Sequence, residues 1–166
     1  MNHVEFVGIA GAGKSTLAAN LRDDHPAAES IGERYGRVVA DLVFPRPVSR
    51  LGGVVPVAIL SNLGRACGVA DRGVNYFSLR NPEMLPTTSE LIAKYAEDSR
   101  RIDFVSGKTL DLVEKFGAIE EFGTDDGTLL LDEGFAFAAA SILHPPQATR
   151  PFSESDLRDY AETVPV

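Results

Sequence analysis

The chain has 166 residues, of which 44% are hydrophobic and 24% charged, so it can bury the core of one domain and is too apolar for a disordered tail. Its formal net charge of −8 argues against nucleic-acid wrapping, and no apolar run reaches the roughly 18 residues of a membrane-spanning helix, so we expect neither partner. One cysteine and no secretory signal pattern predict a cytoplasmic protein, with residues 1–166 forming a single domain.

The N-terminal part of the chain predicts one strand and two helices. Residues 4–7 are rich in β-forming side chains and predict a short strand. A glycine-rich turn over 8–13 follows, and from Lys14 the apolar residues recur at helical spacing until about 23–26. A further helix is expected over 31–44.

The middle of the chain is less regular. Prolines and glycines interrupt residues 44–86, within which residues 54–63 fit a buried helix or a strand, with a helix preferred. Thr87 and Glu90 have the spacing of a capping box, so a helix is expected to begin there. A second helix is expected over about 108–121.

The C-terminal part predicts a buried strand and two more helices. Residues 128–131 form a short apolar run, typical of a strand that is buried on both faces. Residues 135–143 are helical in pattern, and Ser153 is expected to cap a last helix that ends near Thr163. Strands that feed helices, with one strand apolar throughout, predict an α/β domain with a parallel sheet.

Residues 8–15 match the phosphate-loop pattern G-x-x-x-x-G-K-[ST] at every fixed position. Glycines let the backbone curl closely enough for several N–H groups to converge on a polyphosphate, and the following helix adds its positive dipole end. Lys14 can reach the phosphates, and the Ser15 hydroxyl can bind Mg²⁺. A chance glycine-rich turn is the alternative, but the position between a strand and a helix favours phosphate binding. The candidate residues are Gly8, Gly11, Ala12, Gly13, Lys14, Ser15 and Thr16.

A second sequence, Ser106-Gly107-Lys108-Thr109, carries only the tail of this pattern. Ile102 occupies the position of the required first glycine, within a predicted helix. We therefore interpret this sequence as a helix start without a phosphate site.

Two carboxylates, Asp132 and Glu133, follow the apolar strand directly. Ligands of open parallel sheets bind at the carboxyl ends of the strands, where one carboxylate can hold Mg²⁺ and its neighbour can polarise a nucleophile. Alone, such a pair more often marks a strand end or a helix cap. Together with the phosphate loop it favours a functional role.

Residues 8–16 and 129–133 together resemble the Walker A and Walker B elements of the P-loop NTPase superfamily, and within it the kinases of small molecules such as nucleosides and nucleotides. The resemblance implies an α/β fold with a three-layer, parallel P-loop NTPase-type sheet flanked by helices. It also implies a helix-rich acceptor region at about 33–122, inserted before the Walker B strand.

The same resemblance implies an ATP-dependent phosphotransferase that acts on a small-molecule phosphate acceptor, with ATP and Mg²⁺ as cofactors. Ser15 and Asp132 would hold the metal, and Lys14 would contact the phosphates. Asp132 and Glu133 join Lys14 as candidate catalytic residues, Glu133 as a candidate base.

The chain departs from these kinases in two respects. Gly134 follows the acidic pair where thymidylate kinases carry an arginine, so no particular nucleotide is indicated. The kinases also continue into another strand, an arginine-bearing lid and a base-binding loop, so the sheet is expected to be incomplete at the C-terminus. Two alternatives stay open: a P-loop ATPase that drives a partner protein, and a truncated, non-catalytic nucleotide-binding protein. An ABC-type signature before the acidic strand and a guanine-binding N-K-x-D sequence are both absent.

The remaining polar residues are interpreted as structural. Arg34 and Arg37 could bind an anionic acceptor, but solvated helix charges are the preferred interpretation. Cys67 is expected to be a small buried thiol. The histidines share no spacing that indicates a metal site; they are His3, His25 and His144.

Overall fold

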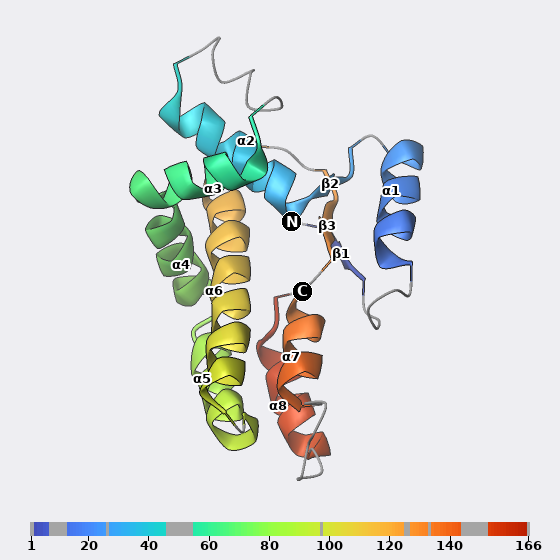
Figure 1. The fold of residues 1–166 in the computed structure, drawn as a ribbon, viewed down its shortest axis with the longest axis vertical. Helices are drawn as coiled ribbons and strands as arrows, with labels where there is room; N and C mark the ends of the chain where they lie inside the picture. Colours follow the sequence, from blue (N-terminus) through green and yellow to red (C-terminus); the bar gives the residue numbers. More distant parts are fainter. Residues whose placement is uncertain are drawn as a thin grey trace.

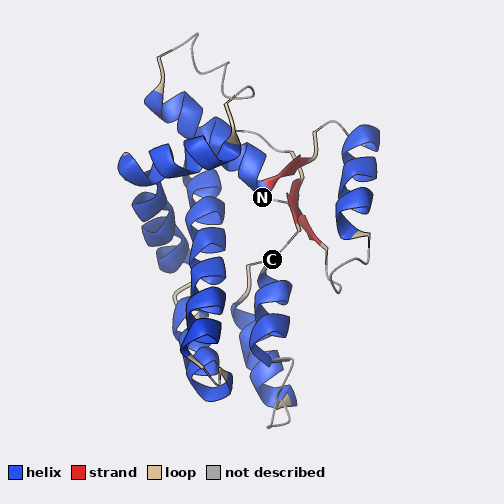
Figure 2. Cartoon of the chain, viewed as in Figure 1, coloured by secondary structure: helices blue, strands red, loops and turns tan. Residues whose placement is uncertain are grey.

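The computed structural model describes residues 2–6, 13–25, 27–45, 55–96, 98–124, 127–132, 134–143 and 153–165. Of these residues 75% are helical, and a small three-stranded sheet lies to one side of most of the helices (Figure 2). None of the helices in these ranges is long and apolar enough to cross a membrane.

The sheet brings the N-terminal residues beside a strand near the other end of the chain (Figure 1). Its strands are β1 (His3–Glu5), β2 (Glu29–Ser30) and β3 (Leu129–Leu131), in the order β1-β3-β2. Both pairings are parallel, and β3 is the central strand. All three strands therefore run toward the same edge of the sheet.

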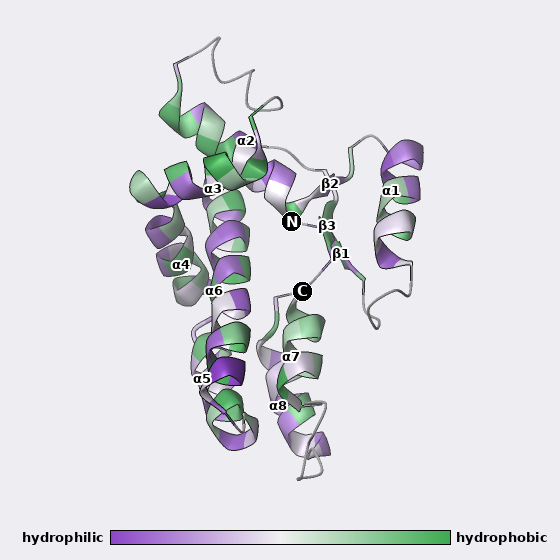
Figure 3. Cartoon of the chain, viewed as in Figure 1, coloured by the Kyte–Doolittle hydropathy of each residue, from purple (hydrophilic) through white to green (hydrophobic). Residues whose placement is uncertain are grey.

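The central strand β3 is buried on both of its faces. Leu130 packs with Phe6 and with Ala18 and Leu21 of helix α1 (Lys14–Asp24). The neighbouring leucines of β3 belong instead to the main helical core. This alternation follows from strand geometry, because successive side chains point to opposite faces. Much of α1 is coloured as hydrophilic in Figure 3, and none of its residues is buried, so it covers its face of the sheet only lightly.

The other helices pack on the opposite face of the sheet and beyond it (Figure 1). They are α2 (Ile31–Val43), α3 (Val57–Ala66), α4 (Val69–Arg80), α5 (Met84–Tyr95), α6 (Ser99–Phe122), α7 (Phe135–Leu143) and α8 (Glu154–Thr163). At the centre of their core, three phenylalanine rings contact one another. The ring centroid of Phe77 lies 6.1 Å from that of Phe116 and 5.7 Å from that of Phe135, and the Phe116 and Phe135 centroids are 5.4 Å apart. Fully burying a ring of this size stabilises a fold by about 1.5–3 kcal/mol, so this core holds α4, α6 and α7 together.

The close contact between helices α4 and α6 depends on two glycines. A Cβ atom built on Gly117 would overlap the backbone carbonyl of Gly73, and one built on Gly73 would overlap the carbonyl oxygen of Glu114. Only a residue without a side chain lets two helix backbones approach this closely. This contact fixes the position of α4 on the longest helix of the described chain.

The predicted fold, a three-layer P-loop NTPase-type parallel sheet flanked by helices, is wrong. The three strands have only three, two and three residues, and eight helices make up most of the described chain. Helices α2 to α6 all lie between β2 and β3 in the sequence. Their apolar residues recur at helical spacing and pack against one another, so they form a core that does not require a large sheet.

Two helix boundaries in the middle of the chain also differ from the prediction. The helix expected to begin at Thr87 begins at Met84, so the supposed capping box lies within α5. The helix expected over 108–121 begins much earlier, directly after Asp98. The Asp98 carboxylate accepts a hydrogen bond from the Arg101 N–H at 2.8 Å, which satisfies a donor of the first turn.

Candidate functional site

The strands that precede the two sequence motifs are neighbours in the sheet. In the pairing of β1 with β3, Glu5 lies opposite Leu131, and the Phe6 N–H donates to the Leu131 carbonyl at 2.9 Å. Because the strands are parallel, the chain leaves β1 toward the phosphate-loop motif and leaves β3 toward Asp132 at the same edge. Open parallel sheets bind their ligands at this edge.

The predicted site residues divide into two groups. Those that the structure describes are Gly13, Lys14, Ser15, Thr16 and Asp132. Those outside the described residues are Gly8, Gly11, Ala12 and Glu133. Within the first group Lys14 is half-buried and the other four residues are exposed. The start of α1 and the end of β3 lie at one end of the sheet (Figure 1).

Helix α1 begins without a capping side chain at its N-cap residue. Gly13 has φ 82° and ψ 14°, a left-handed conformation that glycine adopts readily, and its carbonyl accepts the Leu17 N–H at 2.9 Å. As a glycine it offers no side-chain oxygen to the amides of the first turn, which belong to Lys14, Ser15 and Thr16. These N–H groups and the helix dipole favour an anion at this end.

Helix α7 also begins at this edge, but its first amides already bind a carboxylate. Glu5, the last residue of β1, accepts a hydrogen bond from the Phe137 N–H at 3.0 Å. Burial raises the pKa of Glu5 above its ordinary value, and the N–H groups of the first turn of α7 oppose that rise. A Cβ atom on Gly134 would collide with the Glu5 carboxyl group. The sequence does not predict this contact by itself, although it shows both an acid at the end of a strand, Glu5, and a glycine before a helix, Gly134.

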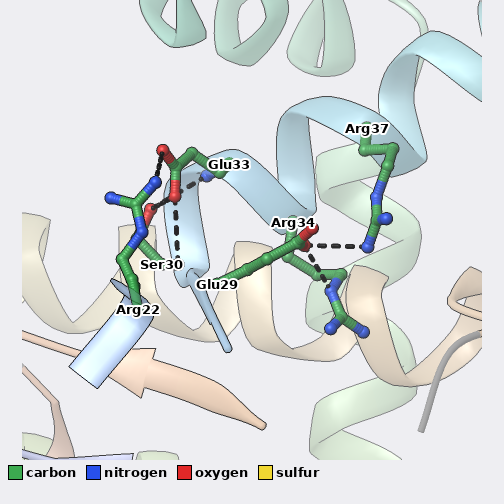
Figure 4. Close-up of polar contacts among 6 residues, drawn as sticks. All are labelled: Arg22, Glu29, Ser30, Glu33, Arg34 and Arg37. Atoms are coloured by element: carbon green, nitrogen blue, oxygen red, sulfur yellow. Dashed lines mark hydrogen bonds and ion pairs between the residues drawn. The ribbon is translucent and has the colours of Figure 1, made fainter. Parts of the chain in front are cut away.

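A second charged cluster follows β2 at the start of α2 (Figure 4). Glu29 accepts hydrogen bonds from Arg34 Nε and Arg37 Nη2, both at 2.8 Å. Arg34 is only 3% exposed, so its interpretation as a solvated helix charge is wrong. The Arg37 side chain is 42% exposed and fits that interpretation better. Burial of a charge requires a partner, which Glu29 supplies to Arg34.

The remaining residues of Figure 4 connect the end of α1 to the start of α2. Ser30 Oγ accepts the Glu33 N–H at 3.3 Å, and the Glu33 carboxylate accepts the Ser30 N–H at 3.2 Å, which completes a capping box. Arg22 Nη2 donates to Glu33 Oε1 at 2.7 Å. Burial opposes ionisation of Glu33, but the Ser30 hydrogen bonds and the Arg22 charge lower its pKa below the ordinary value. This group stabilises the start of α2.

The described residues contain no group of three or more His, Cys, Asp or Glu side chains that could hold a metal ion. Mg²⁺ bound to a nucleotide needs no such group, because phosphate oxygens and water supply most of its ligands. The Ser15 hydroxyl and the Asp132 carboxylate, both exposed at one edge of the sheet, fit this donor set. They suit a Mg²⁺ ion that arrives with a polyphosphate.

Cys67 and His3 are two further residues for which the sequence predicts a structural role. Cys67 is exposed at the C-terminal end of α3, so the prediction of a buried thiol is wrong. Gly68, with φ 74°, turns the chain into α4 directly after it and leaves the thiol at the surface. His3 packs edge-on against Phe116 with 5.5 Å between ring centroids, which supports a structural role.

Comparison of the chain with protein-family models, with curated proteins and with solved structures gives no match. The proposal of a function therefore depends on the parallel pairing of β1 with β3 and on the two sequence motifs that follow these strands.

Proposed function

We propose that the chain binds ATP with Mg²⁺ at the carboxyl edge of its sheet and transfers a phosphoryl group to a small molecule such as a nucleoside or nucleotide. One observation carries the proposal: β1 and β3 pair in parallel, with His3 opposite Leu129. This pairing directs the phosphate-loop motif and Asp132 to one edge.

Each described residue has a distinct role in this proposal. The backbone N–H groups at the start of α1 bind phosphate oxygens, aided by the helix dipole. Lys14 places a positive charge beside the terminal phosphates, and the Ser15 hydroxyl and the Asp132 carboxylate complete the Mg²⁺ ligands. ATP supplies the phosphoryl group, and the chain positions it and stabilises the charge that develops during transfer.

The proton of the acceptor hydroxyl requires a separate base. Glu133 is the candidate, because it follows Asp132 directly in the sequence. Glu5 lies at the same edge, but its carboxylate is hydrogen-bonded to the first turn of α7. We therefore propose that Glu133 is the base that accepts the proton of the acceptor hydroxyl, and that Glu5 has a structural role.

Calorimetric titration of residues 1–166 with ATP, with and without Mg²⁺, tests the binding step. We expect Mg²⁺-dependent binding that Lys14→Ala abolishes without loss of helical circular dichroism. Lys108→Ala is the matched control, since Lys108 stands in a similar sequence, Gly-Lys-Thr in place of Gly-Lys-Ser, but is exposed in the middle of α6. Unchanged ATP affinity in Lys14→Ala, or equal losses in both variants, would refute the phosphate site.

Asp132→Asn tests the metal role separately. The substitution removes a negative charge, so we expect it to weaken the Mg²⁺ dependence of binding more than the affinity for ATP alone. Equal Mg²⁺ dependence in the wild type and the variant would contradict this role. A screen of nucleosides and nucleotides for ADP formation then tests transfer. Binding without transfer would favour the non-catalytic alternative, and ADP formation without an acceptor would favour an ATPase.

A further inference from the structure

Glu5 takes the place of a capping side chain at the start of α7. The Ala138 N–H donates to the Gly134 carbonyl at 3.0 Å, so Gly134 is the N-cap residue, and as a glycine it has no side-chain oxygen for the first amides. The Glu5 carboxylate accepts the Phe137 N–H at 3.0 Å instead. A Cβ atom on Gly134 would collide with the Glu5 carboxyl group, so a capping side chain at residue 134 and Glu5 exclude each other. The helix is therefore capped by a carboxylate from the first strand of the sheet.

Asp132 lies closer to this helix in the sequence, only two residues before Gly134. Helix N-termini attract carboxylates, because the first amides are free donors and the helix dipole is positive there. Asp132 is nevertheless exposed, whereas Glu5 is half-buried beside the first turn of α7. The amides that would attract Asp132 are thus already occupied by a carboxylate from a different strand.

We infer that Glu5 is a positioning residue for the metal: it occupies the first amides of α7 and so leaves the Asp132 carboxylate free to bind Mg²⁺. This inference rests on the proposed function, in which Asp132 is a Mg²⁺ ligand. Without Glu5 the amides of α7 compete with the metal for Asp132, because both interact with the same carboxylate oxygens. Glu5 ends the strand that leads into the phosphate-loop motif, so one side chain connects that strand to the helix after the acidic pair.

The Mg²⁺ dependence of ATP binding tests this role by calorimetry. In Glu5→Ala the amides of α7 attract Asp132, so we expect Mg²⁺ to bind the ATP complex roughly tenfold more weakly, with unchanged affinity for ATP alone. Glu5→Asp should have the same effect, because its shorter side chain ends one methylene group before the amides. Glu5→Gln keeps an oxygen acceptor at the same length and should restore the wild-type Mg²⁺ dependence. Wild-type Mg²⁺ dependence in both Glu5→Ala and Glu5→Asp would overturn this inference and leave the proposed function intact.

Tyr160→Phe controls for a general loosening of α7. The buried Tyr160 hydroxyl donates to the Phe135 carbonyl at 3.0 Å, in the same first turn. Its removal frees a carbonyl and not an amide, and a carbonyl does not attract a carboxylate. We therefore expect Tyr160→Phe to lower the urea midpoint of unfolding and to leave the Mg²⁺ dependence unchanged. Equal losses of Mg²⁺ dependence in Tyr160→Phe and Glu5→Ala would overturn the inference, because loosening alone would then explain both.

Hydrogen exchange of the first amides of α7 tests Glu5 without nucleotide or metal. In Glu5→Ala we expect Asp132 to accept these N–H groups, so the additional change Asp132→Ala should accelerate their exchange. Asp132→Ala in the wild-type background should leave the exchange unchanged, because Glu5 still binds the amides. Equal effects of Asp132→Ala in the two backgrounds would overturn the inference. Failure of the wild type to bind ATP with Mg²⁺ would instead refute the proposed function, so the two failures are distinguishable.

Discussion

Glu5 combines two opposing influences on one carboxyl group. Its position between the end of β1 and the start of α7 buries it, which disfavours the charged form, while backbone N–H groups of α7 favour that form. Burial prevails and raises the pKa of Glu5 above its ordinary value of 4.5. The folded state therefore binds the Glu5 proton more tightly than the unfolded state does.

The pH dependence of stability should reflect this difference. The stabilising contribution of Glu5 is complete below pH 4.5 and is lost as the pH rises through the raised pKa. Glu5→Gln removes the titration, so we expect the free energy of unfolding of the variant, relative to the wild type, to increase as the pH rises above 4.5. Urea denaturation of both proteins between about pH 3 and pH 7, a range that includes the ordinary pKa of 4.5, measures this difference in the free energy of unfolding.

Glu33→Gln is the matched control, because the pKa of Glu33 is shifted in the opposite direction to that of Glu5. The pKa of Glu33 is lowered, so its contribution is present above pH 4.5 and is lost as the pH falls through the folded pKa. The variant should therefore lose stability relative to the wild type as the pH rises toward 4.5. Parallel curves for Glu5→Gln and the wild type would contradict the assignment of Glu5.

The two arginines that bind Glu29 should differ in how much they contribute to the free energy of unfolding. Arg34 is buried and Arg37 is partly exposed, although both donate to the same carboxylate. We expect Arg34→Met to lower the free energy of unfolding by about 1–3 kcal/mol, because a buried hydrogen bond to a charge is lost. Arg37→Met should lower it by less than about 1 kcal/mol, as exposed ion pairs do. Equal losses in urea denaturation would show that burial does not distinguish the two.

At the scale of the element, the contact between α4 and α6 makes the sharpest prediction. Gly117 faces the backbone of Gly73, whereas Gly107 in the same helix has open space around it. We expect Gly117→Ala to lower the free energy of unfolding by about 2 kcal/mol or more through overpacking. Gly107→Ala should raise it by about 0.5–1 kcal/mol, because alanine loses less entropy in a helix. Thermal and urea denaturation of both variants provide the comparison, and a stable Gly117→Ala protein would refute the close approach.

Some elements could be predicted from local sequence and others could not. The bounds of α7 agree with the prediction, because its apolar run is continuous and prolines follow it in the sequence. The start of α5 was missed, since a threonine and a glutamate three residues apart occur inside helices as well as at their ends. Helix α6 begins after Asp98, whose carboxylate caps it. The sequence does not indicate this cap, because it does not show that α5 ends shortly before Asp98.

At the scale of the whole molecule, the size of the sheet was the main error. The apolar run at β3 correctly predicted a strand buried on both faces. A sequence does not show how many further strands join such a strand, because strand pairing depends on residues far apart in the chain. Most apolar residues between β2 and β3 lie in helices and pack in the helical core, so they do not form additional strands.

The candidate site was predictable to the extent that it depends on short motifs. The Gly-Lys-Ser sequence and Asp132 were identified from local pattern, and the neighbouring positions of their strands are a finding of the structure. The burial of Arg34 and the contact of Glu5 with α7 could not be predicted, because both depend on tertiary packing.

The pairing of β1 with β3 also has a consequence for the order in which the protein forms during translation. Glu5 and its partner Phe137 are separated by 132 residues, so a ribosome that adds about 5–20 residues per second needs roughly 7–26 s to synthesise the second after the first. During that interval β1 has no strand to pair with, while α2 to α6 emerge and can assemble around their own core. Strand β1 therefore stays unpaired, like the exposed strand edges that make folding intermediates prone to aggregation, until β3 leaves the exit tunnel.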